Sequence, residues 1–322
     1  MNNLQTEYNL VSVICTVYNQ SLFIEAALLS VENQSINNWE LIVIDDASTD
    51  DSWEAVQKFP FKFPEKTKLL RNETNIGICA SFNRAFKLSK GNWIVDFSGD
   101  DVMASDRLQK QLGIVKNLPE RFGVAYGYTQ QIDENGKILP TIVPDIGKGQ
   151  HGDLFSTLLS RYLLFSGSML IRREIIEQLN GYDETLAYED FDFWIRSSRI
   201  CSYAFLPEII HFQRIHKTNF SRKFEAFENS LDQSTYRVLR KAEKLVKNQN
   251  EEKALYERIR IELFGALRKR NYYTAKKYGT WLYKLKPSTV SKVFIYIVFT
   301  NKVILNPAIN ASRFFRNIIG AF

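Results

Sequence analysis

Cysteine, methionine and histidine are scarce in this chain, with three of each among 322 residues. The cysteines, Cys15, Cys79 and Cys201, have no paired spacing, so we expect reduced thiols rather than a disulfide framework. No stretch reaches the roughly 18 uninterrupted apolar residues of a membrane-spanning helix, and residues 1–10 lack the basic and apolar segments of a signal peptide. These absences predict a cytoplasmic protein without a membrane span.

Acidic residues are missing from the last part of the chain. No Asp or Glu follows Glu262, whereas eleven Lys or Arg do. Residues 222–322 therefore carry a net charge of +13, and residues 1–221 carry −7. This segregation predicts an acidic module suited to metal chemistry and a basic module suited to a polyanionic surface. We place the domains at residues 1–222 and 223–322.

Apolar runs and amphipathic stretches alternate in the first hundred residues, which is typical of repeated β-α-β units. Because the apolar runs are continuous, they predict an α/β fold with a mostly parallel sheet covered by helices on both faces. Ligands of such sheets bind at the carboxyl ends of the strands. The expected strands are 10–17, 41–44, 67–70 and 93–97, with helices at 22–33, 53–58 and 77–88 between them; short strands at 122–128 and 137–142, a helix at 153–162, and helices near 232–247, 251–270 and 272–285 follow.

Glycine is absent from the turn after the first expected strand, where residues 18–21 read YNQS. A nucleotide-dependent dehydrogenase needs glycines there for the backbone to approach a pyrophosphate, so that class is excluded. A sugar-phosphate nucleotidyltransferase also needs a glycine-rich basic loop at this place and is the weaker enzyme alternative. A non-catalytic protein whose basic tail binds membrane or nucleic acid is the other alternative.

Two pairs of adjacent carboxylates follow expected strands. Residues 96–101 read DFSGDD and end in Asp100 and Asp101, and Asp45 and Asp46 end the second strand. Neighbouring like charges are stable where they share a cation, and Mg²⁺ or Mn²⁺ prefers oxygen ligands. The alternative for the first pair is a solvated turn that leads to a helix N-cap at Ser105. Pairs at the ends of parallel strands converge on one crevice, which favours the metal site.

The order of these segments resembles the signature of glycosyltransferase family 2, whose members have the GT-A fold. The resemblance covers roughly the first 220 residues. It implies an inverting, metal-dependent transfer of a sugar from a nucleotide diphosphate donor to a hydroxyl group. The matching segments are 11–19 (VSVICTVYN), 45–50 (DDASTD), 75–77 (NIG), 99–101 (GDD), 181–184 (GYDE) with 188–194 (YEDFDFW), and 214–216 (RIH) with Asn219 and Ser221.

The resemblance also implies roles for the donor-side residues. Thr16 and Asp46 would contact the nucleobase, and Asp46 would accept the imide proton of uracil or thymine, which implies a UDP- or dTDP-sugar. Asp100 would bind the ribose, and Asp101 would hold Mn²⁺ or Mg²⁺ at the diphosphate. Further candidates for this side are Asn75 and Arg84 for the nucleotide and His216 as a second metal ligand.

On the acceptor side, Asp190 resembles the family's catalytic base, and Glu189 beside it could raise its pKa. The alternative is an amphipathic helix over residues 189–200 whose acids face solvent. Ser166, Gly167 and Trp194 are the other expected acceptor contacts.

The basic C-terminal module lies outside the resemblance. Its acid-free sequence, its aromatic residues and its apolar runs at 293–299 and 303–305 are typical of a helix in the headgroup region of an anionic membrane. The alternative is a helical bundle packed on the catalytic domain or in a homodimer. The first reading predicts an enzyme at the inner face of the cell membrane that acts on a glycan or lipid-linked acceptor in surface polysaccharide synthesis, without a nucleic-acid partner.

Overall fold

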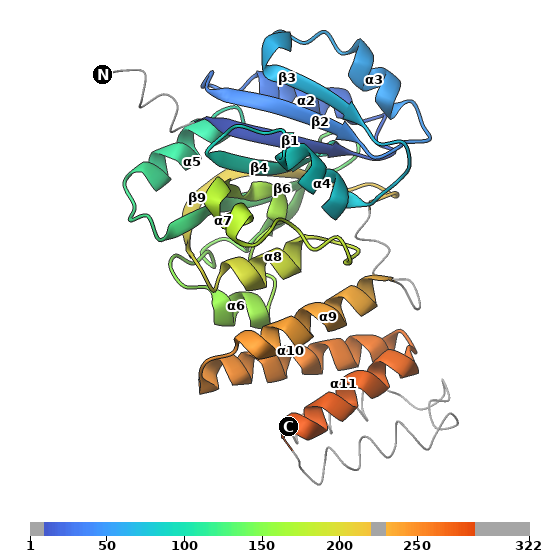
Figure 1. Ribbon diagram of the computed structural model, residues 1–322, viewed down its shortest axis with the longest axis vertical. Coiled ribbons are helices and arrows are strands. Elements are labelled where there is room, and N and C mark those ends of the chain that lie inside the picture. Colours follow the sequence, from blue (N-terminus) through green and yellow to red (C-terminus); the bar gives the residue numbers. More distant parts are fainter. Residues whose placement is uncertain (1–9, 220–229, 287–322) are drawn as a thin grey trace.

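The computed structural model describes residues 10–219 and 230–286. A nine-stranded sheet runs through it in the order β3-β2-β1-β4-β8-β6-β9-β5, and β7 pairs with β6 (Figure 1). The strands are β1 (Val11–Val17), β2 (Trp39–Asp45), β3 (Thr67–Arg71), β4 (Trp93–Ser98), β5 (Val102–Met103), β6 (Phe122–Ile132), β7 (Ile138–Val143), β8 (Leu170–Arg172) and β9 (Ser202–Arg214).

The N-terminal half of the sheet is parallel, as the continuous apolar runs predict. β1 lies between β2 and β4 and is parallel to both. Successive β1 residues enter opposite cores: Val13 and Cys15 pack in one apolar cluster, while Ile14 belongs to the other. The covering helices of this half are α2 (Ile24–Glu32), α3 (Ser52–Lys58) and α4 (Ile78–Phe86), and a 3-10 turn, η1 (Pro64–Lys66), precedes β3.

The rest of the sheet is mixed rather than parallel. β8 is antiparallel to β4 and β6, β5 is antiparallel to β9, and β6 and β9 are parallel. β6 and β7 form a hairpin whose turn is closed by Asp133, which accepts hydrogen bonds from the backbone N–H groups of Asn135 and Lys137. The elements between these strands are α5 (Arg107–Lys116), α6 (Phe155–Ser160), η2 (Ser166–Ser168), α7 (Arg173–Gln178) and α8 (Asp190–Ser197).

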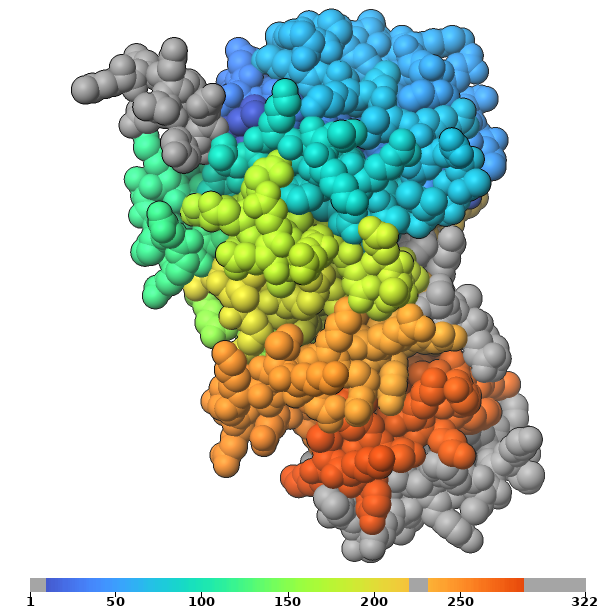
Figure 2. Space-filling model, viewed as in Figure 1, coloured from blue at the N-terminus to red at the C-terminus, as the bar shows by residue number. Residues whose placement is uncertain are grey.

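Three helices follow the sheet, as predicted: α9 (Ser230–Leu245), α10 (Gln249–Arg268) and α11 (Tyr272–Leu285). Leu239 of α9 and Ile259 of α10 share one apolar cluster with Leu158 of α6 and Phe191 of α8. Figure 2 shows the orange segment against the yellow-green part of the sheet domain, with the red segment against the orange one. The helices α9 and α10 therefore pack on α8 and α6, and α11 packs on α10. The expected apolar runs at 293–299 and 303–305 lie outside the described residues.

None of the helices in the two described ranges combines the length and the hydrophobicity that a bilayer crossing requires.

Candidate functional site

The ends of β1, β2 and β4 bring the predicted donor-side residues to one edge of the sheet. Thr16 is paired in register with Ile44 of β2 and Ser98 of β4, so Asp46 and Asp100 follow on either side of it. The backbone N–H of Asp46 donates to the carbonyl of Val17, and that of Gly99 donates to the carbonyl of Thr16. Three short parallel strands thus fix the mutual spacing of the acidic turns.

The turn after β1 is held by side chains rather than by glycine. Asn19 has a φ of 54°, a left-handed conformation that asparagine tolerates. Its side-chain oxygen accepts the backbone N–H of Thr49 at 2.8 Å, and its own N–H donates to Ser48 Oγ at 3.0 Å. The side chain of Gln20 donates to Ser98 Oγ at 3.1 Å. The three turns therefore form one cross-linked rim.

Asp46 organises the loop that carries Asn75. Its Oδ1 accepts from the Asn72 side chain at 2.7 Å and from the backbone N–H of Ile76 at 2.9 Å, and its Oδ2 accepts from the backbone N–H of Gly77 at 2.9 Å. Gly77 has a φ of 87°, which favours glycine here. Asn75 is exposed beside this anchor.

Arg84 is exposed and already engaged. Its guanidinium donates to the side-chain oxygen of Asn72 at 2.5 Å and to the carbonyl of Arg71 at 3.1 Å. It supports the Asp46 loop from outside.

The two adjacent carboxylates after β4 have different partners. Asp100 Oδ2 lies 2.9 Å from His216 Nε2, and Asp100 Oδ1 accepts from Ser98 Oγ at 2.5 Å. Asp101 Oδ2 lies 3.0 Å from His211 Nε2, and Asp101 Oδ1 accepts from the backbone N–H of Arg214 at 2.9 Å. The sequence prediction names Asp101 as the metal ligand. In the structure Asp101 is 3% exposed and is held from the interior by His211 and Arg214, whereas Asp100, at 8% exposed, lies beside His216, the other predicted metal ligand.

The interior behind Asp101 contains charged groups that sequence reasoning missed. Arg107 is fully buried and lies 3.2 Å from His211 Nδ1. Burial raises the pKa of Asp101 well above its usual value, and the nearby charge of Asp100 adds to this. Burial, followed by the charge of Arg107, lowers the pKa of His211 well below its usual value. A lone histidine in an apolar strand and a lone arginine at a helix start give no sequence signal of such a pairing.

The loop after β9 holds His216 in place. The His216 Nδ1 lies 2.8 Å from Thr218 Oγ1, and the His216 backbone N–H donates to the Asn219 side chain at 2.6 Å. The imidazole is tilted against the Phe23 ring, with the ring centres 4.7 Å apart. Within residues 10–219 and 230–286, no group of three or more His, Cys, Asp or Glu side chains could hold a metal ion. Asp100 and His216 supply two suitable donors, which fits a cation that takes its other ligands from phosphate and water.

Ser166 and Gly167 lie in η2, beside the pair formed by Asp101 and His211. A Cβ on Gly167 would lie 2.7 Å from His211 Nε2, so only glycine leaves room for this histidine. Trp194, the other expected acceptor contact, is 2% exposed and packs beside Tyr162. In this conformation the Trp194 ring therefore belongs to the core, so the acceptor contact expected from the sequence stays a prediction.

A second group of acids surrounds the start of α8. Asp190 and Glu189 are partly exposed at its first turn, and Asp96 lies buried on β4, where its Oδ2 accepts from Tyr182 Oη at 2.9 Å. Burial raises the pKa of Asp96 to about 7 and that of Asp190 to about 6, and it raises the pKa of Glu189 well above its usual value. The alternative of a helix whose acids all face solvent does not hold for Asp192 of the same helix, which is 1% exposed.

Comparison with known proteins decides the family. The profile of Glycosyl transferase family 2 matches residues 12–179, about half of the chain. The protein belongs to glycosyl transferase family 2. This confirms the resemblance seen in the strand-end segments.

Relatives within family 2 match the same part of the chain. An uncharacterized glycosyltransferase of Rickettsia bellii is 30% identical over 227 residues, which cover 70% of this chain and 32% of that protein. The putative glycosyltransferase EpsE of Bacillus subtilis is 32% identical over 193 residues, which cover 58% of this chain and 66% of EpsE. The matches thus span from a third to two thirds of these relatives.

Solved structures confirm the GT-A fold. Staphylococcus aureus TarS 1-349 in complex with UDP-GlcNAc superposes with a TM-score of 0.62 at 17% identity, over 90% of this chain and 79% of that one. The mannosyltransferase PcManGT of Pyrobaculum calidifontis, in complex with GDP-Man and Mn²⁺, gives a TM-score of 0.57 at 16% identity, over 89% of this chain and 78% of that one.

Proposed function

We propose that the protein is an inverting, metal-dependent glycosyltransferase that moves a sugar from a UDP- or dTDP-sugar to a hydroxyl of a glycan or lipid-linked acceptor in surface polysaccharide synthesis. The observation that carries this proposal is the meeting of Asp100 and His216 at 2.9 Å at the strand ends, with Asp190 in a separate acidic group bordered by the same strand. Family membership and the nucleotide sugars in the titles of TarS and PcManGT support it.

On the donor side, Asp100 and His216 would hold Mn²⁺ or Mg²⁺, which differs from the sequence prediction in exchanging Asp100 for Asp101. A divalent cation bound there supplies charge neutralisation to the departing nucleoside diphosphate. Asp101 would instead anchor the turn from behind, through His211 and Arg214.

The nucleobase would lie beside Thr16 and Asp46. A carboxylate oxygen can accept two hydrogen bonds, and Asp46 Oδ2 accepts one, from the backbone N–H of Gly77. That oxygen therefore retains capacity for the imide N–H of uracil or thymine, which supports a UDP- or dTDP-sugar donor. Asn75 and Arg84 stand at the rim of the same loop.

On the acceptor side, Asp190 would act as the base that takes the proton of the attacking hydroxyl. Its pKa of about 6, raised by burial, keeps it ionised at neutral pH and still basic enough to accept a proton. Ser166, Gly167 and Glu189 would border the acceptor. Displacement from the face opposite the diphosphate in a single step would invert the sugar.

Calorimetric titration with UDP, with and without Mn²⁺, tests the donor site. We expect Mn²⁺-dependent binding that Asp100→Asn abolishes, because that carboxylate would hold the cation. Asp101→Asn is the matched control, since it removes the neighbouring charge at nearly constant size and should leave the binding. Loss of binding only in Asp101→Asn would restore the original assignment. A folded protein that binds none of UDP, dTDP and GDP would exclude the glycosyltransferase proposal.

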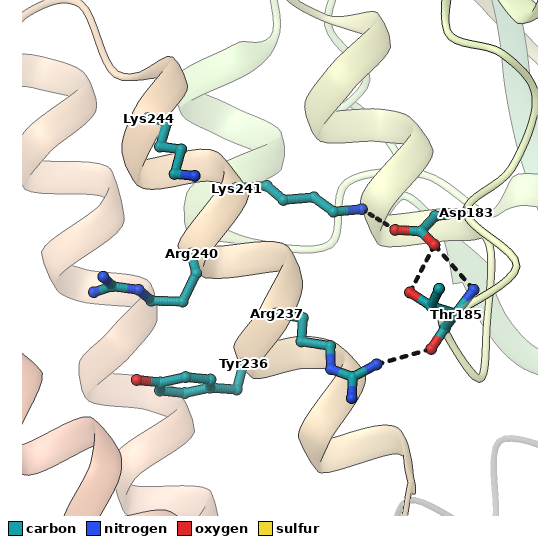
Figure 3. Close-up of a pocket in the computed structure, with 7 residues that line it drawn as sticks. All are labelled: Asp183, Thr185, Tyr236, Arg237, Arg240, Lys241 and Lys244. Carbon is teal, nitrogen blue, oxygen red and sulfur yellow. Dashed lines mark hydrogen bonds and ion pairs between the residues drawn. The ribbon is translucent and has the colours of Figure 1, made fainter.

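We also propose peripheral contact with an anionic membrane through the basic face of α9. Arg237, Arg240 and Lys244 recur at intervals of three and four residues and are exposed. Figure 3 shows Arg237 and Lys241 reaching from α9 toward Thr185 and Asp183 across a groove. The groove measures about 370 Å³ and is lined by Asp183, Thr185, Tyr236, Arg237, Arg240, Lys241 and Lys244.

Co-sedimentation with lipid vesicles tests this contact. Lys247, which follows the end of α9, is also exposed. Each basic residue near an anionic surface contributes about 1 kcal/mol, so joint Lys244→Glu and Lys247→Glu substitution should weaken binding to phosphatidylglycerol vesicles about tenfold or more. Lys116→Glu, an exposed lysine on α5, is the control. Equal binding to vesicles of phosphatidylcholine alone would contradict an electrostatic contact.

A further inference from the structure

A buried cation from the C-terminal helices reaches the start of α8. Arg258 of α10 is 2% exposed. Its guanidinium carbon lies 4.4 Å from the ring centre of Phe191 and 4.3 Å from that of Tyr162. Phe191 directly follows Asp190, and its backbone N–H donates to Asp190 Oδ1 at 2.5 Å. Arg258 therefore packs against the residue that anchors the proposed base.

The charge of Arg258 is only partly compensated by its own helix. Its Nε donates to Glu262 Oε1 at 2.7 Å, and the Glu262 side chain is 25% exposed. Its Nη2 is buried and has no hydrogen-bond partner. The Tyr162 side chain also interacts with the guanidinium. A buried cation is costly unless an anion lies in its field. Asp190, the residue before Phe191, is an anion whose charge interacts with that of Arg258.

The surroundings of Asp190 show why this cation matters. The groups that interact with its charge are the carboxyls of Glu189 and Asp96, the phenols of Tyr162 and Tyr188, and Arg258. Burial raises the pKa of Asp190, while the Phe191 N–H and then the charge of Arg258 lower it. Arg258 is the cation among these groups, so it opposes the protonation that burial favours.

We propose that Arg258 is a positioning residue of the transferase, which clamps Phe191 at the start of α8 and holds the neighbouring Asp190 in its charged, proton-accepting form. This inference rests on the proposed function of Asp190. It makes the helical module part of the catalytic unit, although the family profile ends at residue 179.

The pH dependence of kcat/KM for hydrolysis of the UDP- or dTDP-sugar, with water as acceptor, tests the proposal. Wild-type activity should fall below about pH 6 as Asp190 is protonated. Arg258→Met should move this acid limb to higher pH, with activity recovering as the pH rises, while Arg258→Lys should keep the limb near its wild-type position. Lys253→Met, an exposed cation on the same helix, is the matched control.

A second variant should shift the acid limb of the pH profile in the opposite direction. Glu262→Gln removes the anion that offsets Arg258, so the acid limb should move to lower pH. Thermal unfolding of Arg258→Met shows whether that variant folds. If it does not fold, Glu262→Gln still tests the proposal. Lower activity at every pH with an unmoved limb in both variants would mean that Arg258 is merely structural, and it would overturn the proposal.

Asp190→Asn separates the two levels of inference. If it retains turnover while UDP binding is intact, the proposed base is wrong and Arg258 has nothing to position. The other outcome is that Asp190→Asn abolishes turnover while Arg258→Met and Glu262→Gln leave the acid limb of the pH profile at its wild-type position. The assignment of Asp190 as the base is then kept, and the inference about Arg258 fails.

Discussion

The molecule has two groups of acids, one just after the end of β4 and one around the start of α8, and they differ in how their charge is compensated. At the strand end, Asp100 and Asp101 each face a histidine, and Asp101 also accepts a backbone N–H. Around α8, Asp96 accepts from a tyrosine hydroxyl, and Arg258 is the cation that offsets the charge of Asp190.

The difference separates two chemical tasks. The carboxylate of Asp100, which lies 2.9 Å from the imidazole of His216 beside the strand ends, is placed to meet a cation and a diphosphate, whereas burial raises the pKa of Asp101 behind it. Carboxyls that are buried together with little compensation resist ionisation, and their raised pKa values bring proton uptake close to neutral pH. The compensated group, Asp100 and Asp101 after β4, therefore suits binding. The undercompensated group, Asp96, Glu189 and Asp190 around the start of α8, suits proton transfer.

The largest expected effect concerns the undercompensated group. Asp190→Asn should lower the rate of donor hydrolysis by about 10²–10⁴-fold, because the amide cannot accept the proton of the attacking hydroxyl. Calorimetric titration should give unchanged UDP binding, since the strand-end residues are untouched. A variant that loses UDP binding as strongly as turnover would contradict the division of tasks.

The next effect concerns the strand-end group. Asp101→Ala leaves His211 Nε2 and the Arg214 N–H buried without acceptors, and should lower the free energy of unfolding by about 2–6 kcal/mol. Asp100→Ala should lower the free energy of unfolding by less, because it also removes the like charge that raises the pKa of Asp101. Urea unfolding of both variants measures the contrast. Equal losses would mean that the two carboxylates share one structural role.

Much of this architecture was predictable from local sequence. Apolar periodicity predicts the order of strands and helices through β4 and the three C-terminal helices. Because the ends of parallel strands meet at one edge of the sheet, it also predicts that Asp46 and Asp100 lie beside Thr16. The mixed second half of the sheet was not predicted, because the pairing of β8 between β4 and β6 depends on long-range contacts rather than on any local pattern.

The division between the two acidic groups was not predictable. Whether Asp100 or Asp101 faces the crevice depends on which one turns toward His211, a residue 110 positions away in sequence from Asp101. Asp96 reads as an ordinary residue of an apolar strand, and Arg258 as one of many helix charges. Their proximity to Asp190 arises only in the folded chain, where Arg258 of α10 contacts Phe191 of α8 and the charges of Asp96 and Asp190 interact.

A smaller effect sharpens the comparison at the strand end. Gly167→Ala places a Cβ 2.7 Å from His211 Nε2 and 2.8 Å from a ring carbon of Phe165, so it should press on the partner of Asp101. Overpacking of this kind costs about 1–3 kcal/mol. Gly113→Ala on α5 meets nothing within 4 Å and should be stabilising by about 0.5–1 kcal/mol. Thermal unfolding that ranks the two variants equally would contradict the tight fit.

The last effect is a pH dependence of stability that belongs to the undercompensated group. Burial raises the pKa of Asp96 from 3.8 to about 7, so the folded state holds its proton more tightly than the unfolded state does. The stability that this proton contributes is fully present below pH 3.8 and is lost as the pH rises through about 7. Asp96→Asn can still accept from Tyr182 and does not titrate, so its melting temperature relative to wild type should rise across this window and then level off. Asp145→Asn is the control, because the pKa of this exposed acid is lowered by Lys148 and it stays ionised there. A difference between Asp96→Asn and wild type that does not change with pH would show that Asp96 is already compensated in the fold, and the contrast between the two groups of acids would then rest on Asp190 and Glu189 alone.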